Sequence, residues 1–557
     1  MLIFVPMKRF LSFSLAALLT VSALAQRQGT RQAELSRNLQ VFSDIYRLLD
    51  TYYVDTLSAD TTIEWAIEGM LQRVDPFTSY YKEDDEDLRL LSTGQYAGIG
   101  SVIRYNRKLK RVMIAQPLTG TPSLEAGLKA GDVLQSVDGV DVEGKTPTEV
   151  TKMLRGDAGT TVKVVVKRPG QEDKPLSFVL TRRNIQQPQV PYYGMQNDSV
   201  GYLLLSGFSN GTSQEVRHAV NELKGEGMKA MILDLRDNPG GVVEEAVNIV
   251  NLFVPKGRKV VYTKGKVPSV NMEFYTTGEP LDTVMPLVVL VNGGSASSAE
   301  ILSGSLQDMD RAVVMGERTY GKGLVQSVRE LPFNRNLKLT ISRYYIPSGR
   351  CIQAYDYRHL NPDGSVGVVP DSLTNVFYTR GGREVRDGGG IKPDVAAEPD
   401  SLSSFVYDVA FSDEMFDWVT GYMNRHPQVA PVGEFSLSDE DYADFADYIQ
   451  ESGFTANRRT PDVLNLLKAA ARLEGYDEDA KTEFEALEAK LKTDMRTGVL
   501  KMKDRITPYL EVEIVSRAHG ESEAIHQQLG DDVVYHRAMQ LLADPDEMQK
   551  ILRPKAN

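Results

Sequence analysis

Apolar runs and helical repeats alternate along the middle of the chain, between residues 200 and 345. Short apolar runs predict strands at 200–208, 228–236 and 286–291, and the last of these has the β-branched content of a buried strand. Helical spacing of apolar residues follows each run, at 212–224, 242–253 and 298–307. A further stretch, 337–345, alternates apolar and polar positions, as a half-buried strand does. This alternation of strands and helices predicts an α/β core.

The first part of the chain has a helical pattern. Apolar residues recur at helical spacing over 34–53, and a second amphipathic helix is predicted over 61–73. The segment that follows, Asp75-Pro-Phe-Thr-Ser-Tyr-Tyr81, predicts a turn with packed aromatic rings. We expect this turn to have a structural role and no chemistry.

The last part of the chain is also predicted to be helical. A Gly-, Asp- and Arg-rich stretch at 361–390, which predicts a mobile loop, precedes it. Helix starts are indicated at Ser438 and Thr460, residues 478–515 are predicted to extend the second of these helices, and a last helix is predicted at 534–551. The sequence does not decide whether this tail serves dimerisation, substrate gating or partner docking.

Composition narrows the class of protein. The 557 residues are 41% hydrophobic and 25% charged, as in an ordinary soluble protein of about three to four domains. The net charge is −13 and no long basic block is present, which argues against nucleic acid as the main partner. The single cysteine, Cys351, excludes an intrachain disulfide.

The N-terminus has the pattern of a secretory signal peptide. Lys8 and Arg9 precede an apolar run at 10–22, and Ala23-Leu-Ala25 fits the small-residue cleavage rule. The apolar run is too short for a comfortable membrane span. The sequence therefore predicts an exported soluble protein, periplasmic or extracellular, with no stable membrane span after cleavage at residue 25.

A serine lies where a predicted strand meets a predicted helix. Turn residues from Asn292 to Ser297 separate the strand at 286–291 from the helix at 298–307. A serine on such a turn is well placed to be a nucleophile, because helix N-terminal amides can stabilise an oxyanion. Ser297 is the candidate.

A serine hydroxyl needs a base, and histidine is not an obvious one here, because none of the six His lies between His218 and His359. Lys322 stands between two glycines, which allow close backbone packing. A desolvated lysine loses several units from its reference pKa of about 10.4 and can act as a base. If this segment is extended, Gln326 shares a face with Lys322 and could bind its amine.

These motifs resemble those of a known family. Gly-Ser-Ala-Ser297 with Glu300, followed by Gly-Lys322-Gly and Gln326, is similar to the carboxyl-terminal processing (tail-specific) serine peptidases. The resemblance implies that Ser297 is the nucleophile, Lys322 the general base and Gln326 the residue that orients the lysine. It also implies a crotonase-like core, with no cofactor and no metal. Glu300 either accepts a hydrogen bond in the site or simply lies near the helix N-terminus, where acidic residues are favoured.

A second segment of the chain also resembles this family, and it concerns the binding of the oxyanion. Asp234-x-Arg-x-Asn-Pro-Gly-Gly241 resembles the family segment that helps to form the oxyanion hole. The resemblance implies Gly240, Gly241 and the amide of Ser298 as candidate donors. The alternative is an ordinary strand-to-helix turn.

Residues 94–182 resemble a PDZ domain. Tyr96–Gly100 is similar to the loop that holds a terminal carboxylate, and Ala126-Gly-Leu-x-x-Gly-Asp-x-Leu134 fits the PDZ pattern. In this fold an extended tail adds a strand to a sheet edge. The candidate tail-binding residues are Gly98, Ile99, Gly100, Val150 and Leu154. The alternative is a module that docks only on its own protease domain.

The sequence thus predicts an α/β multidomain chain with a crotonase-like protease core, an inserted PDZ domain (mixed α/β) and helical N- and C-terminal parts. The predicted parts are a signal peptide (1–25), an N-terminal helical region (26–93), a PDZ domain (94–182), a Ser-Lys protease core (183–399) and a helical C-terminal domain (400–557).

The predicted function is that of an exported serine endopeptidase that captures protein or peptide substrates by their accessible C-termini. It would cleave them through an acyl-enzyme, without a cofactor. Alternatives are a catalytically silent PDZ scaffold and a crotonase-like enzyme acting on acyl thioesters. The sequence does not decide whether the protein forms a homo-oligomer.

Overall fold

The computed structural model describes residues 31–82, 93–171, 173–360, 366–399 and 401–553. The predicted signal peptide, residues 1–25, lies outside the described residues. Contacts divide the chain into two units, Met1–Glu83 with Gln326–Thr340 and Asp84–Val325 with Ile341–Asn557. None of the helices in the described ranges is long and apolar enough to cross a membrane.

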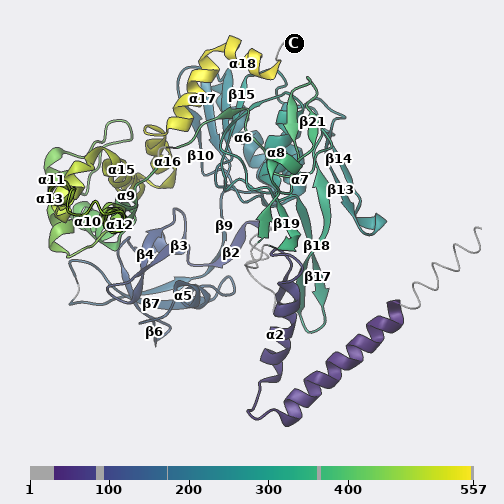
Figure 1. Cartoon of the computed structure of the whole chain (residues 1–557), viewed down its shortest axis with the longest axis horizontal. Coiled ribbons are helices and arrows are strands. Elements are labelled where there is room, and N and C mark those ends of the chain that lie inside the picture. Colours follow the sequence, from purple (N-terminus) through teal and green to yellow (C-terminus); the bar gives the residue numbers. More distant parts are fainter. Residues whose placement is uncertain (1–30, 83–92, 172, 361–365, 400, 554–557) are drawn as a thin grey trace, which may run out of the picture. The chain divides into compact units, whose positions relative to one another are not determined.

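The first unit contains the predicted N-terminal helices. Residues 31–52 are helical, and α2 (Ala59–Leu71) begins at Ser58, whose hydroxyl accepts from the Thr61 amide. A short strand, β1 (Ser79–Tyr81), follows and pairs antiparallel with β18 (Arg335–Tyr345) at Asn336–Lys338. Figure 1 shows α2 in purple.

A six-stranded sheet forms the centre of the second unit. Its order is β10 (Tyr192–Met195), β11 (Val200–Leu204), β12 (Ala230–Asp234), β15 (Leu287–Val291), β16 (Val313–Gly316) and β23 (Val395–Ala396). β10 pairs antiparallel with β11, and the other neighbours are parallel. The strands β12 and β15 are entirely buried, as expected for parallel strands covered on both faces.

Helices cover both faces of this sheet. Alternate strand residues point to opposite sides, so each strand contributes apolar side chains to both faces. On one face, Leu233 and Val289 join the core formed by α6 (Thr212–Gly225), α7 (Val243–Phe253) and α8 (Ser298–Asp308). On the other, Ile232 and Val288 pack with α17 (Val533–Ala543) and α18 (Pro545–Leu552). The end of the chain therefore completes the core of the predicted protease region (Figure 1).

A second sheet contains longer antiparallel strands. Its order is β1-β18-β13-β14, with β17 (Leu324–Leu331) also paired to β18. β13 (Lys259–Gly265) pairs with β14 (Glu273–Tyr275). The strand predicted at 337–345 is confirmed as β18. Two small hairpins follow, β19 (Tyr355–Leu360) with β20 (Val366–Val368) and β21 (Val376–Tyr378) with β22 (Glu384–Arg386).

The segment predicted as a PDZ domain forms an antiparallel sheet. Its strands are β3 (Ser101–Asn106), β4 (Arg111–Pro117), β5 (Val133–Val137), β6 (Val140–Asp141), β7 (Thr161–Lys167) and β8 (Leu176–Thr181). The helices α4 (Pro122–Glu125) and α5 (Pro147–Leu154) accompany it, and a Thr146/Glu149 capping box begins α5. β2 (Gln95–Gly98) pairs with β9 (Arg183–Gln186).

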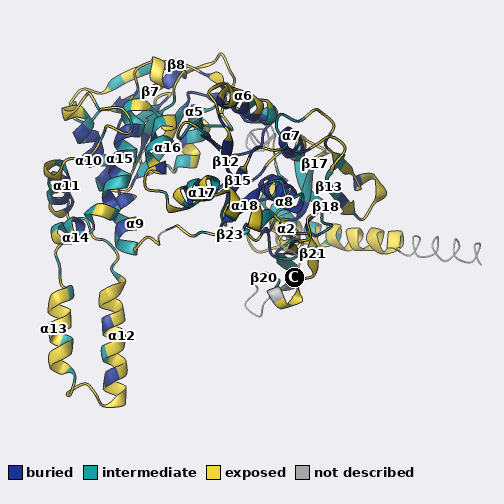
Figure 2. Cartoon of the chain, turned by 90° about the horizontal axis from the view of Figure 1, so that it is seen from above, coloured by how far each residue is buried: buried dark blue, intermediate teal, exposed yellow. Residues whose placement is uncertain are grey.

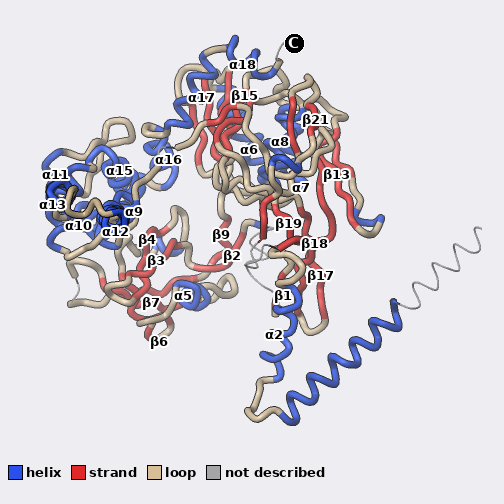
Figure 3. Tube along the Cα trace, viewed as in Figure 1, coloured by secondary structure: helices blue, strands red, loops and turns tan. Residues whose placement is uncertain are grey.

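The C-terminal part is helical, as predicted. It contains α9 (Ser404–Ala410), α10 (Asp413–Arg425), α11 (Asp439–Glu451), α12 (Arg459–Glu474), α13 (Lys481–Leu491), α14 (Met495–Lys501), α15 (Lys503–His519) and α16 (Glu521–Leu529) before α17. Figure 2 shows α12 and α13 side by side and mostly exposed, and Figure 3 shows that this part consists of helices and loops.

One helix prediction was wrong in its extent. The stretch at 478–515 is divided among α13, α14 and α15, and is not one helix. Asp494 begins α14 by accepting from the Thr497 amide, which starts a new helix inside the predicted one.

Candidate active site

Ser297 occupies a strained turn between β15 and α8. Its φ of 54° and ψ of −114° lie in a region that residues other than glycine rarely adopt, at a cost of about 1–3 kcal/mol. Gly240 packs directly against this turn, because a Cβ on it would lie 2.8 Å from the Ser297 Cβ. The predicted nucleophile therefore has the backbone geometry of a nucleophile elbow.

Glu300 connects the serine turn to the lysine segment. Its carboxylate is fully buried, and the Oε2 atom accepts from the backbone amides of Ser297 and Lys322, each at 2.9 Å. The Oε1 atom accepts from the Thr319 hydroxyl at 2.6 Å and the Gly321 amide at 2.8 Å. Of the two roles left open for Glu300, the structure therefore supports hydrogen bonding inside the site.

Burial raises the pKa of Glu300 from 4.5 to about 7, although the donated hydrogen bonds oppose this shift. The carboxylate is thus held near the midpoint of its titration at neutral pH.

Tyr344 binds the same two backbone segments from their carbonyl side. Its hydroxyl lies 2.7 Å from the Lys322 carbonyl oxygen and 3.1 Å from that of Ser297, and shares one hydrogen between them. The side chain is buried, which raises its pKa well above 10.0 and keeps the phenol protonated. Sequence reasoning missed this residue: the alternation in β18 indicates a core-facing tyrosine but not its partners.

Lys322 is half-buried and lies two residues before the start of β17. The close packing predicted for its glycine neighbours is present at Gly321, which has a φ of +85° and where a Cβ would lie 2.3 Å from the Ala354 Cβ. The backbone of Lys322 is fixed by Glu300 and Tyr344. The structure thus brings two predicted residues, Ser297 and Lys322, to one carboxylate.

Gln326 belongs to the first unit, whereas Lys322 belongs to the second. Its side-chain Nε2 donates to the Thr340 hydroxyl at 3.2 Å. This bond uses the amide nitrogen of Gln326 and leaves its Oε1 as an acceptor. The orientation of Lys322 by Gln326 stays a prediction.

The turn at Asp75, predicted to have only a structural role, is linked to Gln326. Asp75 accepts from the Thr78 amide at 2.8 Å and from the Thr78 hydroxyl at 2.9 Å. The same hydroxyl accepts from the Thr340 amide at 3.2 Å and lies 3.4 Å from the Thr340 hydroxyl. A chain of hydrogen bonds therefore runs from Gln326 through Thr340 and Thr78 to the Asp75 carboxylate.

The three predicted oxyanion donors lie around the serine turn, but they differ in whether the backbone amide already has a hydrogen-bond acceptor. The Gly240 amide donates to the Asn238 side chain at 2.9 Å. Within the described parts of the chain, the amides of Gly241 and Ser298 have no hydrogen-bond acceptor. The Ser298 hydroxyl donates to the Gly241 carbonyl at 2.9 Å and so fixes the two segments together. Gly240 could serve as a donor only by leaving Asn238.

Known families and proteins are similar to this chain. Peptidase family S41 matches residues 199–374, a PDZ domain matches 113–168, and "Probable PDZ-protease, C-terminal helical domain" matches 406–542. A carboxy-terminal-processing protease of Bartonella bacilliformis is 34% identical over 367 residues, 65% of this chain and 80% of the relative. The chain belongs to the carboxy-terminal-processing proteases.

The chain is similar to other known proteins as well. A carboxyl-terminal-processing protease of Synechocystis is 37% identical over 313 residues, 55% of this chain and 70% of the relative. A solved photosystem II D1 C-terminal processing protease is 28% identical, with a TM-score of 0.34, covering 65% of this chain and 94% of its own. The protein is a serine-type peptidase, and the family matches confirm the predicted fold class.

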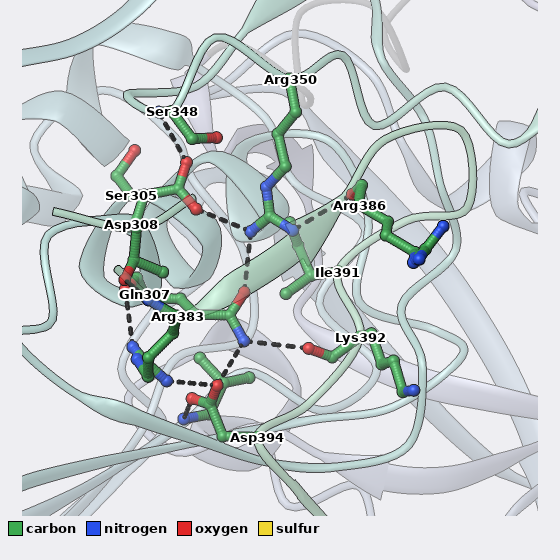
Figure 4. A network of polar contacts seen from close by, with 12 residues as sticks. Ser305, Gln307, Asp308, Ser348, Arg350, Arg383, Arg386, Ile391, Lys392 and Asp394 are labelled. Carbon is green, nitrogen blue, oxygen red and sulfur yellow. Dashed lines mark hydrogen bonds and ion pairs between the residues drawn. The ribbon is translucent and has the colours of Figure 1, made fainter. Parts of the chain in front are cut away.

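A buried polar network anchors the far end of α8 in this protease (Figure 4). Arg350, only 1% exposed, donates at 2.8 Å to both Asp308 and the Gln307 side chain. Arg383 pairs with Asp394 and donates to the Gln307 carbonyl at 2.8 Å. Arg383 lies in the stretch predicted as a mobile loop, but Asp394 and the sequence-remote Gln307 hold it in the core.

A cavity of about 550 Å³ lies beside the tail-binding candidates. Gly98, Ile99, Gly100 and Leu154 line it. Val150 is fully buried in the core of the domain, and its neighbour Thr151 lines the cavity instead. The cavity is large enough for several side chains of an extended peptide.

Proposed function

We propose that this protease cleaves peptide bonds through an acyl-enzyme on Ser297, with Lys322 as general base. The observation that best supports this proposal is that the backbone amides of both residues donate to one carboxylate oxygen of Glu300. Neutral Lys322 takes the hydroxyl proton as Ser297 Oγ attacks the substrate carbonyl, and passes the proton to the departing amine. Water then attacks the ester and gives a proton to the lysine. The lysine returns this proton to Ser297 Oγ as the Oγ–acyl bond breaks, which releases the carboxylic acid and regenerates the serine.

The developing oxyanion would be bound by backbone amides. The amides of Gly241 and Ser298 are the donors that we favour, because each has no acceptor in the described part of the chain. Gly240 would contribute by its close approach to the serine turn, since a side chain there would collide with Ser297. Such fixed donors stabilise charge that appears only in the transition state.

Gln326 would orient the base. Its amide nitrogen donates to Thr340, so that Oε1 can accept a hydrogen bond from the amine of Lys322. A single orientation of the amine would favour proton transfer from Ser297.

The substrates would be proteins or peptides with accessible carboxyl termini. The PDZ match and the cavity lined by Gly98, Ile99, Gly100 and Leu154 support tail binding. A tail would pair with a sheet edge and place its carboxylate at the glycine loop. Val150 would support the groove from inside the domain core.

We further propose that residues 1–25 are a signal peptide and that the mature protease acts in the periplasm or outside the cell. Its parts would be 26–93, 94–182, 183–399 and 400–557. N-terminal sequencing of the purified mature protein tests the export proposal: it predicts a start after Ala25, and a mature chain that retains the first residues would contradict it.

The catalytic proposal is tested with a tailed protein substrate and mass spectrometry of the products. Ser297→Ala and Lys322→Ala should each abolish cleavage while the circular dichroism spectrum is unchanged. Cleavage by folded Ser297→Ala at the wild-type rate would rule out the proposed nucleophile.

A further inference from the structure

The tail cavity has walls from two different parts of the chain. The PDZ domain contributes the loop at Gly98–Gly100 and Leu154 on α5. The second wall of the cavity comes from His519–Ser522, where α15 ends and α16 begins. His519 and Glu521 are exposed. A tail in this cavity would therefore meet the C-terminal helical part as well as the PDZ domain.

Specific contacts hold the PDZ domain against these helices. Arg104 on β3 donates to Asp413 at the start of α10, at 2.7 Å. Phe416 on α10 packs with Met113 and Val133 of the PDZ sheet in a small apolar cluster. The Arg104 guanidinium also lies 4.5 Å from the centre of the Phe416 ring. Because α15 packs on α10, this interface places the end of α15 beside the groove.

The cavity is charged differently at its two walls. Arg155 lies beside the glycine loop, with its guanidinium 5.2 Å from the centre of the Tyr96 ring. Glu521 is the acidic side chain of the opposite wall. In the described ranges, no lysine or arginine forms an ion pair with Glu521. A carboxylate that faces a peptide groove favours a basic side chain in the ligand.

We propose that the turn at His519–Ser522 is part of the tail-binding site and that Glu521 selects tails with a lysine or arginine upstream of the terminal residue. The inference rests on the proposed function, in which tails bind this cavity with the carboxylate at the glycine loop. An extended peptide advances by about 3.3 Å per residue, so the residues upstream of the terminus would run on through the cavity that Glu521 also lines. The C-terminal helical part thereby acts in substrate selection.

The test uses the full chain with Ser297→Ala, which prevents cleavage of the probe. Fluorescence anisotropy gives the Kd of peptides with one apolar terminal residue and Lys, Gln or Glu at one upstream position at a time. We expect about five-fold tighter binding of Lys than of Glu peptides at one position, the size of a surface ion pair. Added salt should weaken this preference.

Three variants assign the preference to the turn. Glu521→Gln should remove it, and Glu521→Lys should reverse it by a similar factor. Glu440→Lys is the matched control, because Glu440 is an exposed acid in the first turn of α11 and does not line the cavity. This control should bind all peptides as the parent does.

The outcomes separate this inference from the proposed function. If tails bind but Glu521→Lys keeps the parent's charge preference, or the parent has none, the role of the turn is refuted while tail recognition stands. If no peptide binds, or if amidated peptides bind equally well, tail recognition itself is refuted and this inference fails with it.

Discussion

Glu300 and Lys322 are joined by a hydrogen bond of 2.9 Å from the lysine backbone amide to the buried carboxylate. The same carboxylate oxygen accepts from the amide of Ser297, so the turn of the proposed nucleophile and the segment of the proposed base are both held by one side chain. Glu300 belongs to the helix that begins after Ser297, so this helix fixes the backbone of Lys322 relative to the serine. A Ser-Lys mechanism requires the two residues to be held in a fixed relative position.

Glu300→Gln should lower kcat by about ten- to hundred-fold with little change in KM. The amide side chain has one acceptor oxygen, so donors that now bind the other oxygen would face an NH₂ group, at a cost of about 1–3 kcal/mol. Peptidase kinetics on a tailed substrate give both constants. A kcat within about two-fold of wild type would show that the carboxylate does not hold the site together.

The raised pKa of Glu300 predicts a pH-dependent stability difference. This pKa is about 7 in the folded chain, above the ordinary value of 4.5, so the folded state binds the proton more tightly than the unfolded state does. The wild type therefore loses stability as pH rises through this interval, and Glu300→Gln does not. The stability of the variant relative to wild type should rise by about 2–3 kcal/mol between about pH 5 and about pH 8.

Denaturant unfolding of both proteins at the two pH values measures this difference. The unfolding signal should come from the protease region, because a multidomain chain need not unfold in one step. A relative stability that is constant with pH would contradict the titration assigned to Glu300.

Tyr344→Phe should lower kcat by about five- to ten-fold, because one buried hydrogen bond is worth about 1 kcal/mol. The hydroxyl would no longer contact the carbonyl oxygens of Lys322 and Ser297. Tyr345→Phe is the control on the same strand, since Tyr345 stacks on Tyr262 with ring centres 5.1 Å apart. Equal activity of the two variants would exclude a positioning role for the Tyr344 hydroxyl.

Thr78→Val should slow cleavage by about five- to ten-fold, and Thr78→Ser should restore it. Valine keeps the shape but breaks the chain from Asp75 through Thr340 to Gln326, whereas serine keeps the hydroxyl. Since Gln326 is proposed to orient the base, the pH profile of kcat should also shift in Thr78→Val. Loss of activity in both variants without a pH shift would indicate a structural role alone.

Local signals in the sequence predict much of this molecule. Alternating strand and helix patterns predict the core, and the strand-turn-helix pattern around Ser297 predicts its position. The glycines beside Lys322 predict close packing, which the structure has at Gly321. Each of these signals lies within a few neighbouring residues, where spacing fixes geometry.

Through-space partners could not be predicted. The donors that Glu300 collects at Thr319–Lys322, and the hydroxyl of Tyr344, come from separate segments that only the folded chain brings together. The partners of Arg383 could not be predicted either, because the composition of the stretch around it indicated a loop. The resemblance to a PDZ domain also made Val150 a candidate for tail binding, although it faces the core of the domain.

The most direct test of the Ser-Lys proposal is labelling by a fluorophosphonate probe, which reacts with activated serine hydroxyls. Peptide mapping by mass spectrometry should find the label on Ser297 in the wild type, at a rate that rises with pH as the base loses its proton. Lys322→Met, correctly folded, should label at least about a hundred-fold more slowly. Labelling of Ser297 at an undiminished rate in Lys322→Met would contradict the account.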